Sequence, residues 1–186
     1  MRVPEILTPD RCALLVVDIQ TRLMPVINGR DEVVKNSVLL LKAAQALRME
    51  IVATTQYAIR IGELLPEIQA DLAGVEPLDK MHFNCFANPV IRERLKALPA
   101  VVNTLVVCGV ETHICIYQTV VGALRDGYRV VVAADAVSSR TLKNHELGLS
   151  RLRELGAVVA SAEMVIYELL GEAGTPEFKA LLPFLK

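Results

Sequence analysis

The sequence predicts a doubly wound α/β fold with a sheet of five or six mainly parallel strands. Short apolar runs rich in β-branched residues alternate with longer segments of helical spacing from one end of the chain to the other. The apolar runs have no polar face, which is typical of parallel strands covered by helices on both sides. The 186 residues are 53% apolar, which is enough for one substantial core, so we expect a single domain over residues 1–186.

The first part of the predicted fold consists of two strands joined by a long helix. Residues 13–17 (ALLVV) are a continuous apolar run that ends at Asp18, as expected for a central strand. After a loop, residues 31–49 carry apolar side chains at helical spacing, and residues 51–55 form the second strand. Residues 56–79 are irregular and contain two glycines and two prolines, so we expect this segment to line a site.

The middle of the chain predicts a short strand and a helix, followed by a longer strand and helix. Residues 81–86 alternate loosely and predict the short strand, and an Asn-Pro pair begins a helix over residues 88–98. Residues 101–108 are the third long apolar strand. Residues 112–126 form the next helix, which Gly127 closes.

The last part continues the alternation of strands and helices. Residues 129–134 (RVVVAA) predict a strand, and residues 142–155 predict an amphipathic helix. A short strand over residues 158–161 follows, then a helix over residues 162–170. A closing helix begins at residues 175–177, where a threonine cap precedes a proline in the first turn.

The site is expected at one edge of this sheet. In doubly wound sheets, ligands bind outside the carboxyl ends of the strands, where the strand order reverses. Asp18, Thr55, Cys115 and Asp135 all follow or end predicted strands. We therefore expect these side chains to lie near the functional edge.

Composition and charge exclude several other classes of protein. The net charge is −1, from 20 basic and 21 acidic side chains that are interspersed, so no basic stripe indicates a nucleic-acid partner. No apolar run approaches the roughly 20 residues of a membrane span, and the N-terminus lacks the apolar core of a signal peptide. We expect a cytoplasmic protein that has no membrane partner.

Cys115 is the strongest candidate for a nucleophile. An apolar run ends at Gly109, a polar turn follows, and Cys115 opens the next helix. A thiol at such a strand-to-helix corner faces backbone N–H groups and the positive end of a helix dipole, which favours the thiolate. Asp18 could serve as the base that takes the thiol proton, and Lys80 could serve as the cation that holds the thiolate.

Each of these residues also has an ordinary structural explanation. An aspartate after a strand often only caps a turn, and the lysine in EPLDKMHF could simply be solvated. The other cysteines, Cys12, Cys85 and Cys108, are too scattered for a disulfide framework and contain no CxxC pair. Free cysteines of this kind commonly pack as small buried hydrophobes.

Four segments together carry a family resemblance. The segments are ALLVVDIQ, DKMHFNCF, VVCGVETHICI and AADAVSSRTLKNHELGLSRLRELGA. In this combination the chain resembles the isochorismatase-like cysteine hydrolase family over nearly its whole length, and best its small isochorismatase-domain branch. The resemblance implies a three-layer α/β/α sandwich around a parallel sheet.

The resemblance also implies a catalytic triad of Asp18, Lys80 and Cys115. By similarity, Asp18 accepts the thiol proton and later returns it to the leaving group, while Lys80 stabilises charge. Cys115 attacks a carbonyl, typically that of an amide, and water hydrolyses the resulting thioacyl intermediate.

The same resemblance implies a cis peptide bond between Val110 and Glu111. This bond would turn the Glu111 amide N–H toward the site, where it would form an oxyanion hole with the N–H of Cys115. In the alternative, Thr112 caps the helix by binding the Cys115 N–H, which would compete for that donor.

The chain departs from the nicotinamidases of this family, which carry a metal-binding Asp and His pattern after the second strand. No histidine precedes residue 81, and His82, His113 and His145 do not form a ligand spacing. We expect no metal and no cofactor, and we disfavour nicotinamide as the substrate. True isochorismatases act on an enol ether and lack the nucleophilic cysteine, so Cys115 argues against that reaction.

Further residues are expected to line a substrate pocket. They are Gln20, Gln56, Tyr57, Phe83, Phe86 and Val110. The glutamines could equally stabilise turns, and core packing is the commoner role for such aromatic side chains.

The leading hypothesis is a metal-independent amide hydrolase that acts on a small molecule. The alternative is an inactive or weakly active homo-oligomeric interaction module, because the segment CIYQTVVGALRDG shows little polar face and could pack on another subunit. A third hypothesis is redox sensing by Cys115.

Overall fold

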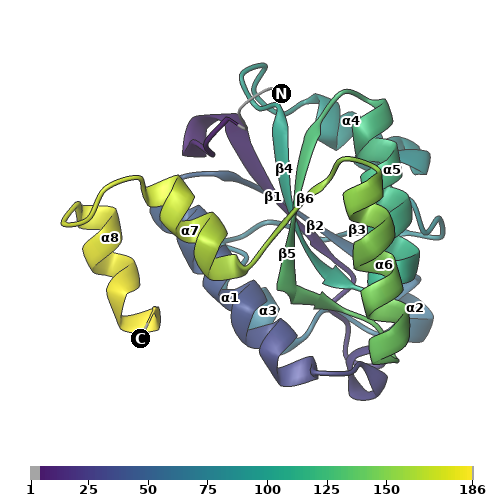
Figure 1. The fold of residues 1–186 in the computed structure, drawn as a ribbon. Helices are drawn as coiled ribbons and strands as arrows, with labels where there is room; N and C mark the ends of the chain where they lie inside the picture. Colours follow the sequence, from purple (N-terminus) through teal and green to yellow (C-terminus); the bar gives the residue numbers. More distant parts are fainter. Residues whose placement is uncertain (1–4, 186) are drawn as a thin grey trace.

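The computed structural model describes residues 5–185 and has three layers (Figure 1). Six strands form one sheet in the order β3-β2-β1-β4-β5-β6, and all neighbouring strands are parallel. The strands are β1 (Cys12–Val17), β2 (Glu50–Gln56), β3 (Leu78–Lys80), β4 (Thr104–Val110), β5 (Arg129–Ser138) and β6 (Val158–Ala160). The predicted three-layer α/β/α sandwich with a parallel doubly wound sheet is confirmed.

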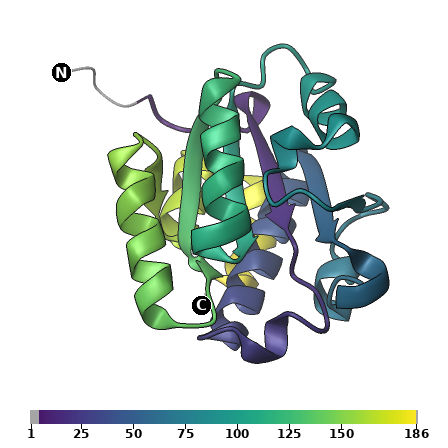
Figure 2. The ribbon, with the colours of Figure 1, turned by 90° about the vertical axis from the view of Figure 1, so that its right-hand side faces the viewer.

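Helices cover both faces of the sheet, as the two perpendicular views show (Figures 1 and 2). One face carries α1 (Arg30–Ala46), α3 (Pro66–Ala70), α7 (Ala162–Leu170) and α8 (Pro176–Leu181). The other face carries α4 (Pro89–Lys96), α5 (Tyr117–Arg125) and α6 (Leu142–Glu154). The short α2 (Ala58–Ile61) follows β2.

The central strand β1 explains why its sequence is apolar at every position. Leu14 and Val16 pack in the core on the α1 face, whereas Leu15 and Val17 pack in the core on the α5 face. Successive side chains of a strand point to opposite faces, so a strand covered on both sides needs apolar residues throughout. All six residues of β1 are buried.

Two strands differ most from the prediction, while β4 is shifted to Thr104–Val110 from the expected residues 101–108. The expected strand at residues 81–86 is wrong, because the strand is Leu78–Lys80, which pairs with the end of β2 through the register Gln56↔Lys80. This pairing places Lys80 at the carboxyl end of β3. Strand β5 continues past Asp135 to Ser138 instead of ending there. Both differences arise from pairing with neighbouring strands, which local patterns do not show.

The helix predicted from residue 112 begins as a π-turn. The turn is Thr112–Ile116, and α5 itself begins at Tyr117. The Glu111 carbonyl accepts the backbone N–H groups of Ile114 (3.0 Å) and Ile116 (3.2 Å). Cys115 therefore lies inside the wider turn and precedes the first residue of the α-helix. Such π-turns are frequent at functional sites.

The strand order reverses between β1 and β4. Asp18 follows β1, and the turn that carries Cys115 follows β4, so both lie at the carboxyl end of this reversal. This is the position where doubly wound sheets bind ligands. Within residues 5–185, none of the helices is both long and apolar enough to span a membrane.

Candidate active site

Asp18 and Lys80 form a fully buried ion pair at the carboxyl edge of the sheet. Lys80 Nζ lies 2.6 Å from Asp18 Oδ2, and both side chains are 0% exposed. Burial on its own lowers the pKa of Lys80, but the Asp18 carboxylate, with smaller contributions from nearby thiols, raises it by more. The net shift is upward, so Lys80 is an ammonium ion at neutral pH.

Strand β2 supplies a hydrogen-bond partner to each ion of this pair. Thr54 Oγ1 donates to Asp18 Oδ1 at 2.8 Å, and Lys80 Nζ donates to Gln56 Oε1 at 2.8 Å. The Gln56 amide is itself fixed, because its Nε2 donates to the Met81 carbonyl at 2.9 Å. Our sequence reasoning missed Thr54. Its position two residues before Gln56 on one strand, and therefore on the same face, is the signal that could have identified it.

The backbone at this edge is shaped by Asp18 and Gly109. Asp18 has a φ of 57°, a left-handed conformation that is uncommon outside glycine, asparagine and aspartate. Gly109, which pairs with Val17, has a φ of 119°, and a Cβ there would lie 1.9 Å from the Val17 carbonyl oxygen. The absence of a side chain at Gly109 lets β4 approach the end of β1 closely. The turn that follows β4 is thereby brought beside Asp18.

Cys115 is 6% exposed and lies beside the ion pair. Burial first, and then the charge of Asp18 and a hydrogen bond to it, raise the pKa of the Cys115 thiol, and Lys80 lowers it only in part. A helix N-terminus contributes at most about 2 kcal/mol, and Cys115 precedes α5. The effect of the helix N-terminus, which the sequence indicated, is therefore outweighed, and the net shift of the Cys115 pKa is upward.

Cys85 is a second buried thiol next to this cluster, and sequence reasoning had treated it only as packing. Its backbone N–H donates to Thr119 Oγ1 at 3.0 Å, and Thr119 lies four residues after Cys115. Burial raises the pKa of Cys85 to about 11, and Lys80 acts in the opposite direction. No sequence motif marks Cys85, because its position beside the ion pair depends on the packing of residues 84–86 against α5.

The peptide bond between Val110 and Glu111 is cis. The Glu111 carboxylate accepts hydrogen bonds from the backbone N–H (2.8 Å) and Nε (3.1 Å) of Arg140, which fix this turn to the loop before α6. The Thr112 hydroxyl lies 2.9 Å from His145 Nδ1. Thr112 is therefore bound to α6, a different arrangement from the helix cap that we considered as an alternative.

Gln20 and Gln56 have structural partners. Gln20 Nε2 donates to the carbonyls of Gln56 (3.1 Å) and Gly62 (2.6 Å), and Gln20 Oε1 accepts the Gln56 backbone N–H at 2.8 Å. These bonds tie the loop after β1 to the loop after β2. The geometry favours the turn-stabilising role for Gln20, whereas Gln56 orients Lys80.

The four apolar residues expected in the pocket fall into two groups. Tyr57 is 37% exposed and Phe83 is 50% exposed, and each lies in a loop at the end of β2 or β3. Phe86 and Val110 are buried in the two cores, and the Phe86 ring lies 5.9 Å from that of Tyr128. Tyr57 and Phe83 therefore remain candidates for contact with a substrate, whereas the placement of Phe86 favours core packing.

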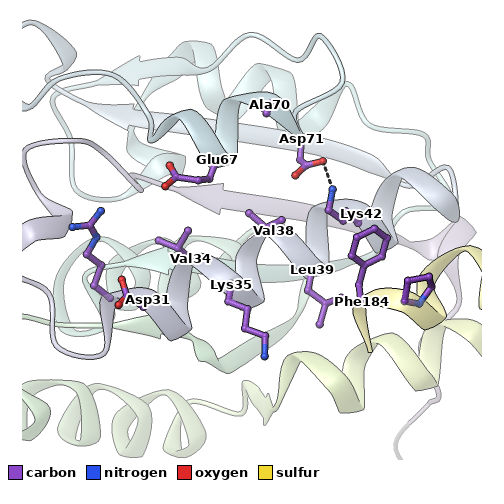
Figure 3. A pocket seen from close by; sticks show the side chains of 12 residues that line it. Asp31, Val34, Lys35, Val38, Leu39, Lys42, Glu67, Ala70, Asp71 and Phe184 are labelled. Carbon is purple, nitrogen blue, oxygen red and sulfur yellow. Dashed lines mark hydrogen bonds and ion pairs between the residues drawn. The ribbon is translucent and has the colours of Figure 1, made fainter. Parts of the chain in front are cut away.

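A large cavity lies elsewhere, between α1, α3 and the C-terminal residues (Figure 3). Its volume is about 630 Å³, and Val34 and Val38 of α1 form part of its apolar floor. At one end, Lys42 pairs with Asp71 at 2.7 Å and lies 5.0 Å from the centre of the Phe184 ring. None of the residues that line this cavity belongs to the predicted triad.

Residues 5–185 contain no group of three or more His, Cys, Asp or Glu side chains placed to hold a metal ion. The cluster at the sheet edge instead combines one carboxylate, one ammonium and two thiols, all buried. This donor set provides a nucleophile, a proton acceptor and a fixed positive charge.

These features define a doubly wound parallel α/β protein with a buried Asp–Lys ion pair and a buried thiol at the switch point of its sheet. The chain belongs to the isochorismatase family. The family model, described as the isochorismatase domain, matches residues 12–164.

Individual relatives agree with this assignment. The secreted isochorismatase effector Isc1 of Phytophthora sojae (strain P6497) is 36% identical over 183 residues, which cover 97% of this chain and 87% of the relative. The structure of the MAR1 ribonuclease from Caenorhabditis elegans superposes with a TM-score of 0.90 at 28% identity, covering 97% of this chain and 92% of that one. The Escherichia coli YcaC gene product, described as an octameric hydrolase of unknown specificity, gives a TM-score of 0.92 at 21% identity, covering 99% and 91%.

Proposed function

We propose that the protein is a metal-independent cysteine hydrolase that cleaves the C–N bond of a small amide-type molecule through a thioacyl intermediate on Cys115. The single observation that carries the proposal is the fully buried Asp18–Lys80 pair, 2.6 Å apart, beside a buried thiol. Burying both charges costs several kcal/mol per ion before their attraction is counted. Perturbed charged clusters of this kind are concentrated at functional sites.

The first half-reaction follows from the protonation states. Cys115 starts as a thiol, so Asp18 takes the proton from Sγ as Sγ attacks the carbonyl carbon. The carbonyl oxygen becomes an oxyanion, which the N–H groups of Glu111 and Cys115 would bind. Asp18 then gives its proton to the departing nitrogen as the C–N bond breaks, and an acyl group remains on Sγ.

The second half-reaction reuses the same carboxylate. Asp18 accepts a proton from a water molecule whose oxygen attacks the thioacyl carbon. The S–C bond breaks, and Asp18 returns the proton to Sγ. Lys80 keeps its positive charge throughout, because the ammonium offsets the negative charge that moves among Asp18, Sγ and the oxyanion.

The test compares the four cysteines within one molecule. The protein is treated with iodoacetamide at pH 6 to 8, and the labelling rate of each thiol is followed by mass spectrometry. It is then incubated with a panel of reactive amides to search for an acyl adduct. We expect Cys115 to be alkylated and acylated first, and Cys115→Ala to lose both signals. Labelling of Cys115 no faster than Cys12, Cys85 or Cys108 would contradict the proposal.

The C. elegans neighbour is named as a ribonuclease. A net charge of −1 with interspersed acidic and basic residues gives no support for binding a polyanion here. We therefore retain a small molecule as the proposed substrate. A cytoplasmic location stays a prediction, since the P. sojae relative is named as secreted.

The structure gives less support than the sequence for the alternative of an oligomeric interaction module. Helix α5 is already covered within the chain, because its apolar residues Val120 and Ala123 are buried and the Tyr117 ring lies 4.4 Å from the Arg151 guanidinium. Assembly into a homo-oligomer remains part of the proposal, supported by the octameric description of the E. coli neighbour.

A further inference from the structure

Thr54 is a buried residue of β2 that was not among the site residues predicted from the sequence. Thr54 is 0% exposed, and its hydroxyl lies 2.8 Å from Asp18 Oδ1. The other carboxylate oxygen, Oδ2, is bound by Lys80. An ionised carboxylate has only acceptor sites, so the single hydroxyl hydrogen of Thr54 points at Asp18.

The two donors fix the rotation of the carboxylate. Lys80 alone would hold one oxygen and leave the group free to turn about its Cβ–Cγ bond. With Thr54 bound to Oδ1 as well, the carboxylate cannot rotate. Its unoccupied lone pairs therefore keep a fixed direction relative to Cys115. Proton transfer requires a hydrogen-bond approach of roughly 2.6–3.2 Å, so this fixed direction affects the rate of the proposed first step.

The backbone of Thr54 is also bound to Asp18. Thr54 pairs with Val17 in the register of β1 and β2, and its carbonyl accepts the Asp18 backbone N–H at 3.1 Å. Thr54 therefore contacts both the backbone and the carboxylate of Asp18.

We propose that Thr54 is a positioning residue for the reaction, which orients the Asp18 carboxylate and stabilises its ionised form. The inference rests on the proposed function, in which Asp18 accepts the Cys115 proton. It assigns Thr54 no contact with the substrate. Hydrogen bonds to a charged group are roughly twice as strong as those between neutral groups, so the loss of this one is measurable.

The chain contains a matched control in the next residue. Thr55 Oγ1 donates to Asp79 Oδ1 at 2.8 Å, the same bond with the same length. Consecutive strand residues point to opposite faces, so Thr55 lies away from Asp18 and binds a carboxylate outside the cluster. Thr54→Val and Thr55→Val therefore remove hydrogen bonds of the same type and length, of which only the first is fully buried and involves the proposed base.

The experiment measures the rate of Cys115 alkylation by iodoacetamide at pH 7 in the full chain and the variants. In Thr54→Val we expect this rate to fall about tenfold, because the Asp18 carboxylate loses the bond that orients it. Thr54→Ser should restore the wild-type rate, and Thr55→Val should match the wild type.

The outcomes separate this inference from the proposed function. If wild-type Cys115 shows no preferential labelling, the hydrolase mechanism fails and the role of Thr54 fails with it. If Cys115 is labelled preferentially and Thr54→Val leaves the rate unchanged, or Thr55→Val lowers it equally, only the role of Thr54 is overturned. Should Thr54→Val not fold, Thr54→Ala is compared with Thr54→Ser, because these two side chains differ only by the hydroxyl.

Discussion

Two lysine–aspartate pairs of nearly identical length occupy different regions of the molecule. Lys80–Asp18 measures 2.6 Å and both side chains are 0% exposed, whereas Lys42–Asp71 measures 2.7 Å with side chains 28% and 19% exposed. The first pair lies beside a thiol at the carboxyl edge of the sheet. The second lies at the rim of the 630 Å³ cavity, next to Phe184 (Figure 3). The large cavity and the buried cluster of ionisable side chains therefore lie in different parts of this protein.

The comparison shows that burial, and not bond length, decides what each pair does. A solvated ion pair contributes about 1 kcal/mol or less, because water already stabilises both ions. A buried pair contributes little net stability, but loss of one partner leaves an uncompensated buried charge at a cost of roughly 3–5 kcal/mol. The Lys80–Asp18 pair is therefore better explained by a role in the proposed reaction than by a contribution to stability.

The largest expected effect comes from breaking each pair at its aspartate. Asp18→Asn removes the proposed base and leaves the Lys80 ammonium buried without a counter-charge. We expect Cys115 alkylation to slow by about 10²-fold or more and the free energy of unfolding to fall by roughly 3–5 kcal/mol. Asp71→Asn should leave the rate of Cys115 alkylation unchanged and should lower the free energy of unfolding by about 1 kcal/mol or less.

Alkylation rates and urea unfolding of both variants check these values. Equal destabilisation by the two substitutions would contradict the claim that burial separates the pairs.

The next effect comes from breaking the pairs at their lysines. Lys80→Met keeps much of the side-chain volume and leaves the Asp18 carboxylate buried alone, so we expect a loss of roughly 3–5 kcal/mol in unfolding free energy. Lys42→Met removes a partly exposed pair and a cation–π contact, which together contribute about 1–2 kcal/mol.

The double variant Asp18→Asn/Lys80→Met sharpens this second prediction. It removes both buried charges, so it should be more stable than either single variant, as measured by urea unfolding. Additive losses in the double variant would show that the two residues stabilise the fold independently.

The sequence located part of this site because Asp18 and Cys115 are marked by local patterns. An apolar strand that stops at an aspartate, and a polar turn that precedes a cysteine, both indicate the carboxyl edge of a parallel sheet. Lys80 had no such mark, since β3 has only three residues, and its place in the prediction came mainly from the family resemblance.

The contacts of Thr54, Cys85 and Gly109 could not be predicted, because each joins segments that are distant in sequence. Only the face of the sheet on which Thr54 lies is indicated, by its position two residues before Gln56. Thr54 reaches Asp18 only through the pairing of β2 with β1, and Gly109 matters only because β4 lies against Val17. The direction of the Cys115 pKa shift could not be predicted for the same reason. Local position indicated a helix N-terminus, whereas burial and the neighbouring carboxylate raise the pKa of the thiol.

The smallest expected effect on stability comes from two buried thiols, one on each face of the sheet. It extends the comparison from ion pairs to single ionisable groups. Burial raises the pKa of Cys108, on the α1 face, to about 12, and raises that of Cys85, beside Lys80, to about 11. The folded state thus keeps protons that the unfolded chain releases above about pH 8.5. Stability present below that pH is therefore lost as the pH rises, by up to about 1.4 kcal/mol per pH unit for each thiol.

Urea unfolding at pH 7.5, 9 and 10.5 measures this loss. We expect Cys108→Ala and Cys85→Ala each to flatten the decline above pH 9, even if their stability at pH 7.5 is lower than that of the wild type. An unchanged decline in both variants would show that the buried thiols do not govern the alkaline stability.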